Sequence, residues 1–126
     1  LVAFCGAKLA PGIDTVLSAV GFDHHLQGCD VVFTGEGRLD GQSLRGKAVT
    51  GIARRAKQAG VPVIALVGDV EPGFREVYTQ GVTAVFSINR KPMRFADSEQ
   101  FSQDWLYDTM ESILRSLQAG MGIRTD

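Results

Sequence analysis

Three features of the sequence predict an α/β fold in which a parallel sheet is flanked by helices. Short apolar runs rich in β-branched residues alternate with segments whose apolar residues have helical spacing. The helical segments end at glycines, which adopt the left-handed conformation of a helix C-terminus at little cost. The apolar runs are continuous rather than alternating, as is typical of strands buried on both faces of a parallel sheet.

Length and composition narrow the class of protein. The chain has 126 residues, of which 44% are hydrophobic and 21% charged, and a net charge of −1. These values suit one compact domain and give no reason to expect nucleic acid or a membrane as a partner. Cys5 and Cys29 have neither CxxC spacing nor a nearby histidine pattern, so we expect a reduced cytoplasmic protein. Leu1 begins a strand-like run without an initiator methionine, so we expect a longer polypeptide to precede it.

The first elements lead into the first strand. Apolar residues with helical spacing predict a helix that ends at Gly21, and a short helical turn is expected at residues 22–28. A β-branched and aromatic run at residues 31–33 predicts a strand buried on both faces. Residues 47–59 carry an apolar stripe and predict a helix that ends at Gly60.

The second half repeats this order. Residues 62–67 predict a second strand, residues 72–81 a short helix, and residues 83–88 a third strand. After a basic loop, Asp97 or Ser98 should begin the last helix, with Gln100 three residues after Asp97 as in a capping box. The predicted apolar face of this helix comprises Phe101, Leu106, Met110, Ile113, Leu114 and Leu117.

This alternation, with short connections, implies right-handed crossovers and a parallel sheet of Rossmann-like or flavodoxin-like type. Three strands are few for such a sheet, so we expect further chain to complete it. Open parallel sheets bind ligands beyond the carboxyl ends of their strands. Three connections lie there, at residues 34–46, 68–72 and 89–96.

The connection at residues 34–46 is the most unusual. It is far longer than the roughly two to six residues that a link between strand and helix requires. Its glycines permit close approach of a ligand, and polar and charged residues stand between them. Lys47 follows at a helix start, where backbone N–H groups favour an anion. A solvated turn is the plain alternative, but the length, position and mixed charge of the segment favour an anion-binding site.

Two common phosphate motifs do not account for this segment. Residues 41–47 fit GxxxxGK, but Ala48 stands where a P-loop has Ser or Thr, and the segment begins too far beyond the strand. Gly35-x-Gly37 has its third glycine at Gly41, one position too late for a dinucleotide fingerprint. We therefore expect neither motif.

The run TGEGRLDGQS at residues 34–43, with Gly46-Lys47 and residues 51–54, closely resembles the type I glycerate kinase family. Residues 6–13, 62–66 and 81–87 resemble it as well. The resemblance implies transfer of the γ-phosphoryl group of ATP to D-glycerate, commonly giving 2-phosphoglycerate. It also implies that the chain is a partial domain of a larger two-domain kinase. Residues 1–28 would return from an inserted second domain, and residues 29–126 would form the C-terminal part of the Rossmann-like domain.

The same resemblance implies a set of site residues, with ATP and Mg²⁺ as cofactors. Arg38 and Lys47 would hold the glycerate carboxylate or a phosphate. Glu36 and Asp40 would bind Mg²⁺ or accept the hydroxyl proton, and which carboxylate does which stays open. These four are the predicted catalytic residues. The predicted cofactor-binding residues are Thr34, Gly35, Gly37, Gln42, Ser43 and Gly46.

Several alternatives stand beside this assignment. A non-catalytic nucleotide- or RNA-binding module is the second class, because residues 38–57 hold six basic residues and one acidic residue. The aromatic residues expected of an RNA platform are missing there. His24 and His25 suit a surface better than a metal site, and Arg90, Lys91 and Arg94 suit a solvated loop better than a phosphate contact. We expect a fragment that is inactive alone, with no nucleic acid or membrane partner; homo-oligomer formation stays open.

Overall fold

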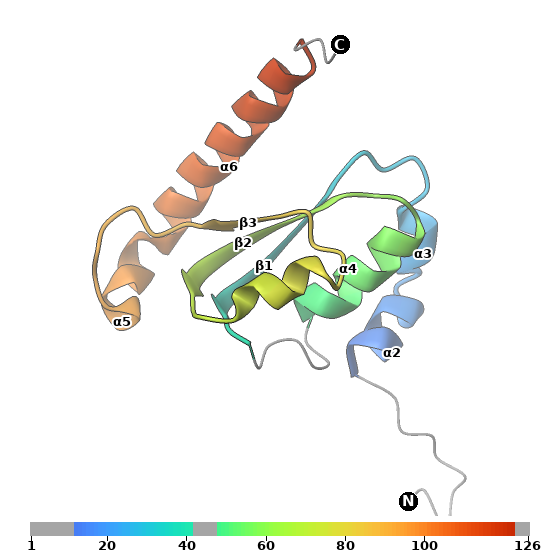
Figure 1. The fold of residues 1–126 in the computed structure, drawn as a ribbon, viewed down its shortest axis with the longest axis horizontal. Helices are drawn as coiled ribbons and strands as arrows, with labels where there is room; N and C mark the ends of the chain where they lie inside the picture. The colour runs from blue at the N-terminus through green and yellow to red at the C-terminus, as the bar shows by residue number, and fades with distance from the viewer. Residues whose placement is uncertain (1–11, 42–47, 123–126) are drawn as a thin grey trace, which may run out of the picture.

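The computed structural model describes residues 12–41 and 48–122. In Figure 1, helices surround one small sheet. The α-helices are α2 (Gly12–Ala19), α3 (Phe22–His25), α4 (Ala48–Gln58), α5 (Phe95–Ser98) and α6 (Ser102–Gly120). The strands are β1 (Val32–Leu39), β2 (Val63–Val70) and β3 (Ala84–Ser87), and the 3-10 helices are η1 (Phe74–Tyr78) and η2 (Glu99–Phe101).

The three described strands form one parallel sheet in the order β1-β2-β3, which confirms the predicted α/β architecture. Val32 pairs with Val63, and Ile64 pairs with Ala84. Helices α4 and η1 pack on one face of the sheet, while α6 packs on the other (Figure 1). The carboxyl ends of all three strands therefore meet at one edge, between the two helical layers.

Strand β1 is longer than the sequence predicts. Residues 34–39, expected as the start of a loop, continue the strand, with Arg38 opposite Asp69 and Leu39 opposite Val70. The backbone N–H of Glu71 then donates to the carbonyl of Leu39 at 2.9 Å. Backbone pairing with β2 thus keeps this glycine-rich stretch extended, although glycine disfavours strands.

The core lies between the sheet and α4, where Ala53, Ala56, Val63 and Val67 are almost fully buried. All residues of β2 from Val63 to Val67 are buried, which suits a central strand covered on both faces. In contrast, residues 31–33 are only half-buried, so the expectation that this run is buried on both faces was wrong. The reason is its place at the edge of the described sheet.

The last helical segment begins earlier than predicted. Asp97 lies inside α5, where its carboxylate accepts from Arg94 at 2.8 Å, and Gln100 donates to the Asp97 carbonyl at 3.2 Å. The predicted capping box is therefore absent from this segment. Trp105 and Ile113 are buried, but Leu114 and Leu117 are exposed by 49% and 42%. The later turns of α6 extend away from the sheet (Figure 1), so much of the predicted apolar face has no cover in the described residues.

Residues 12–28 pack against α4. A Cβ atom on Gly51 would lie 2.6 Å from Cγ1 of Ile13, so only glycine lets α2 approach this closely. Arg55, with a side chain that is 17% exposed, donates from Nη2 to the carbonyl of Asp14 and from Nη1 to the carboxylate of Asp23, each at 2.9 Å. Leu26 is buried in the core between the sheet and α4. Across the described ranges, we find no helix with the length and apolar character that a bilayer crossing needs.

Candidate functional site

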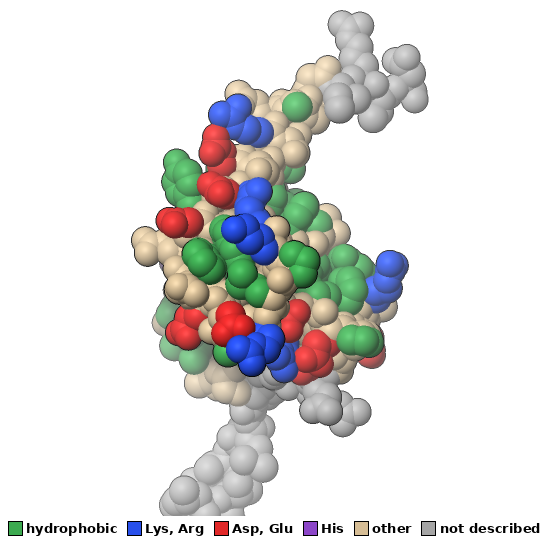
Figure 2. Space-filling model, turned by 90° about the vertical axis from the view of Figure 1, so that its left-hand side faces the viewer, with side chains coloured by type: hydrophobic (Ala, Val, Ile, Leu, Met, Phe, Trp, Pro, Cys, Tyr) green, Lys and Arg blue, Asp and Glu red, His purple; other side chains and the backbone are tan. Residues whose placement is uncertain are grey.

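The candidate site lies at the edge where the three strands end. Figure 2 shows the molecule from this side, with hydrophobic side chains grouped in the middle and a band of acidic and basic side chains below them. This edge is the position at which open parallel sheets bind ligands. The site thus combines an apolar part and a charged part.

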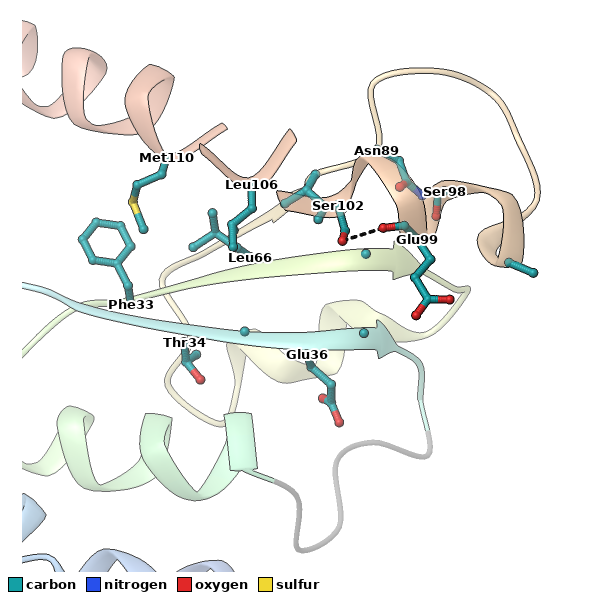
Figure 3. Close-up of a pocket in the computed structure, with 15 residues that line it drawn as sticks. Phe33, Thr34, Glu36, Leu66, Asn89, Ser98, Glu99, Ser102, Leu106 and Met110 are labelled. Atoms are coloured by element: carbon teal, nitrogen blue, oxygen red, sulfur yellow. Dashed lines mark hydrogen bonds between the residues drawn. The ribbon is translucent and has the colours of Figure 1, made fainter. Parts of the chain in front are cut away.

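The residues of β1 divide between the two sides of the sheet. Phe33 points toward α6, whereas Thr34 and Glu36 point to the opposite side, where α4 lies (Figure 3). Because strand side chains alternate, Gly35 and Gly37 occupy positions on the Phe33 side. The Oε2 atom of Glu36 is shielded from solvent. The predicted Thr-Gly-Glu-Gly run therefore presents polar side chains to one side and bare backbone to the other.

Arg38 is held at the edge by two acidic residues from β2 and the turn after it. Its Nη1 atom lies 3.0 Å from Oε1 of Glu71, and its Nε atom lies 3.7 Å from Oδ2 of Asp69. All three side chains are at least one third exposed, so these ion pairs orient the guanidinium more than they stabilise the fold. These pairings are not evident from the sequence alone. The parallel register supplies the missing information, because it sets the ends of β1 and β2 side by side.

A groove of about 730 Å³ lies on the other side, between the strand ends and the α5–α6 segment (Figure 3). Its apolar walls come from Phe33, Leu66, Ile88, Leu106 and Met110. Toward the strand ends its lining becomes polar, with Asn89, Ser98, Glu99 and Ser102. The hydroxyl of Ser102 donates to the carbonyl of Glu99 at 2.7 Å.

Each of the three connections predicted beyond the strand ends contributes to the groove, through residues 34–37, Gly68, and Asn89 with Ala96. The wall from α6 was not predicted. Leu106 and Met110, expected on the apolar face of the last helix, both line the groove; Leu106 is 44% exposed, and Met110 also packs against the smaller core cluster. One pattern in the sequence does point to the groove floor. Alternation of side chains from Thr34 to Arg38, with glycine at every second position, has the period of a strand with one bare face.

The predicted site residues are brought together in part. Thr34, Gly35, Glu36 and Gly37 line the groove through β1, Arg38 lies beyond them on the same strand, and Asp40 follows directly after the strand. The remaining predictions, Gln42, Ser43, Gly46 and Lys47, lie outside the described residues. The structure therefore describes the predicted site residues from Thr34 to Asp40 only.

The donor chemistry of Glu36 and Asp40 fits Mg²⁺. Both offer carboxylate oxygens, and Mg²⁺ in phosphate-transfer sites takes about one or two carboxylates, with substrate phosphates and water as its other ligands. Within residues 12–41 and 48–122, no group of three or more His, Cys, Asp or Glu side chains could hold a metal ion. These two residues therefore suit a metal that arrives with a phosphate ligand, not a closed protein cage.

The other candidate groups have structural partners or lie on the surface. His24 and His25 are exposed on α3. In the basic loop, Arg90 lies 3.8 Å from Asp108, and Arg94 lies 2.8 Å from Asp97.

Part of the basic excess at residues 38–57 is offset in space, at the three arginines that the structure describes there. Arg54 lies 3.7 Å from Asp14, and Arg55 pairs with both Asp14 and Asp23. Arg38 faces Asp69 and Glu71. Acidic side chains from other elements thus neutralise arginines that appeared as a positive cluster in the sequence. At these three arginines the arrangement disfavours an RNA-binding surface, which needs unpaired positive charge along a groove.

Comparisons with known proteins give one consistent result. The model of the glycerate kinase family matches residues 1–118. The glycerate kinase of Bacillus cereus is 38% identical over 90% of this chain and 30% of that protein. The glycerate 2-kinase of Escherichia coli is 35% identical over 96% of this chain and 32% of that protein. A solved structure from Salmonella typhimurium LT2, assigned as glycerate kinase 2, matches with a TM-score of 0.72 and 34% identity over 98% of this chain and 30% of that chain. The chain thus spans about a third of the length of the relatives it matches.

Proposed function

The chain belongs to the glycerate kinase family, and on this basis we propose that it forms the C-terminal part of an enzyme that phosphorylates D-glycerate with ATP. The product is 2-phosphoglycerate. The observation that carries the proposal is the family match over residues 1–118. The position of the TGEG run at the carboxyl edge of a parallel sheet supports it, because ligands bind at such edges.

The chain supplies one part of the catalytic centre and is inactive alone. Its length, about a third of that of its relatives, supports this view. Residues 1–28 return from an inserted second domain, and residues 29–126 belong to a Rossmann-like domain that further chain completes. The enzyme acts in the cytoplasm.

Phosphoryl transfer requires neutralised phosphate charge, an aligned acceptor hydroxyl and a group that takes the hydroxyl proton. Arg38 and Lys47 bind the anionic groups of the substrates. Asp69 and Glu71 fix the direction of the Arg38 guanidinium before a substrate arrives, which lowers the cost of ordering it.

Glu36 and Asp40 share the remaining tasks of holding Mg²⁺ and accepting the hydroxyl proton. Mg²⁺ bound with ATP would neutralise charge on the β- and γ-phosphates. Glu36 projects from a hydrogen-bonded strand rather than from a free loop, so its carboxylate is positioned in advance. Thr34 lies on the same side of β1 and can bind the acceptor or a phosphate oxygen through its hydroxyl.

The test replaces the matching segment of the Bacillus cereus glycerate kinase with this chain. A coupled assay with D-glycerate and Mg-ATP should show turnover by this chimeric kinase and none by residues 1–126 alone. Phosphorus NMR of the product would identify the phosphorylated hydroxyl. A chimeric kinase that folds but phosphorylates other hydroxy acids in preference to D-glycerate would refute the substrate assignment, and activity of the chain alone would refute its dependence on the rest of the polypeptide.

A further inference from the structure

We propose that the groove between the strand ends and the α5–α6 segment binds the nucleoside of ATP, with the base in its apolar half and the ribose beside Glu99. The inference rests on the proposed kinase function and adds to it a location for the nucleotide. None of the predicted site residues comes from α5, η2 or α6, although these elements form one whole wall of the groove.

The size and lining of the groove select a nucleoside over the acceptor. Its volume of about 730 Å³ lies within the range of roughly 300–1,000 Å³ that small-molecule sites occupy. D-glycerate is a small anion that needs a cation, yet the charged side chains that line the groove are the carboxylates Glu36 and Glu99. Glu36 points to the far side of β1, which leaves Glu99 on the groove side (Figure 3). A neutral, flat base with a hydroxyl-bearing sugar suits this lining better than an anion.

The apolar half of the groove offers surfaces for an aromatic ring. Phe33 stands on the sheet, and Leu106 and Met110 face it from α6 (Figure 3). Aromatic rings and thioether sulfur both pack favourably against a flat ring.

Glycines keep the floor of the groove low. Gly35 and Gly37 of β1 and Gly68 of β2 line it without side chains, so a ligand can approach the backbone. At Gly35 even a Cβ atom would lie 3.2 Å from the carbonyl oxygen of Leu66. The glycines at positions 35 and 37 thus make room for a ring on the side of β1 opposite Thr34 and Glu36.

The polar half suits a ribose. Glu99 and Asn89 lie near the ends of the strands (Figure 3), and a carboxylate is a strong acceptor for ribose hydroxyls. This order along the groove places the base deepest and the sugar at the strand ends. The phosphates then extend toward the edge at which β1 presents Arg38.

Two exposed leucines of α6 give a matched test in the chimeric kinase. Leu106, 44% exposed, lines the groove, whereas Leu117, 42% exposed, does not. We expect Leu106→Ala to raise the KM for ATP about tenfold and to leave the KM for D-glycerate unchanged, because one apolar contact with the base is lost. Leu117→Ala should change neither constant, and circular dichroism would confirm that both variants fold.

The ribose contact has its own test. Glu99→Gln should reduce the preference for ATP over 2′-deoxy-ATP or 3′-deoxy-ATP about tenfold, measured as a ratio of kcat/KM values, because a site that bonds a hydroxyl rejects the analogue without it. The control is Glu76→Gln on η1, which packs on the other face of the sheet.

The outcomes separate this inference from the proposed function. If Leu106→Ala raises the KM for D-glycerate instead, the groove binds the acceptor, and the inference is wrong while the kinase function stands. If neither constant changes, another segment of the polypeptide covers the groove, and the inference is again wrong. If the chimeric kinase has no activity, its binding of adenosine is measured by saturation-transfer NMR. Binding that Leu106→Ala weakens about tenfold supports the groove, and no binding overturns it.

Discussion

At the residue scale, the ion pairs of Arg38 are expected to matter more for the proposed function than for stability. Its guanidinium lies between Asp69 and Glu71, and all three side chains are partly exposed to water. Exposed pairs of this kind contribute about 0–1 kcal/mol to folding. A fixed guanidinium at the edge of a parallel sheet is, however, ready to bind a carboxylate or a phosphate through two of its N–H groups.

Substitution of Arg38 should therefore affect activity far more than stability. In the chimeric kinase, Arg38→Ala should lower kcat/KM by about 10²- to 10³-fold, while the free energy of unfolding changes by less than about 1 kcal/mol. Steady-state kinetics and urea denaturation would measure the two effects. Arg75→Ala, an exposed arginine on η1, is the control and should alter neither. Unchanged kinetics in a folded Arg38→Ala protein would remove Arg38 from the site.

At the element scale, local patterns of the sequence predicted most helices and strands. They did not predict features that depend on contacts between elements. The apolar stripe of α4 and the continuous apolar run of β2 each contain enough information to define their element. The extension of β1 through Gly35 and Gly37 depends on backbone pairing with β2, which glycine propensities do not reveal. Likewise, helical spacing placed Leu106 on the apolar face of the last helix. It did not reveal that Leu106 lines a groove rather than a closed core.

The candidate site was predictable to a similar degree. Its location followed from the rule that ligands bind at strand ends, and its residues from family resemblance. The partners of Arg38 could not be predicted, because they come from β2 and the following turn, about thirty residues away in the sequence.

One element contact can be tested directly. Arg55 joins α4 to α2 and α3 through hydrogen bonds to Asp14, Ser18 and Asp23. Arg55→Ala should lower the free energy of unfolding by about 2–3 kcal/mol, since hydrogen bonds of a charged, largely buried group are lost. Hydrogen exchange should also become faster in residues 12–28. Neighbouring Arg54, with one pair at 3.7 Å and an exposed side chain, is the matched control, and Arg54→Ala should cost less than about 1 kcal/mol. Equal effects of the two changes would contradict a specific role for Arg55.

At the scale of the whole molecule, the described chain leaves apolar surface uncovered on α6. Leu114 and Leu117 are exposed there, Tyr107 is 71% exposed, and Met121, directly after the helix, is exposed as well. The sheet adds unpaired strand edges, because β1 and β3 each have a described neighbour on one side only. Exposed apolar patches and open strand edges both favour association with other chains.

Residues 1–126 expressed alone should therefore self-associate. Size-exclusion chromatography with light scattering should give a mass above 13.6 kDa that rises with concentration. Leu114→Lys with Leu117→Lys should shift the chain toward the monomer, because charge on α6 opposes apolar contact. A control with Thr15→Lys and Gln27→Lys adds the same charge at exposed polar positions away from α6 and should leave the association unchanged. If both double variants lower the measured mass equally, net charge rather than the α6 surface governs association. If the unmodified chain is monomeric at every concentration, the exposed leucines are not sufficient to drive association.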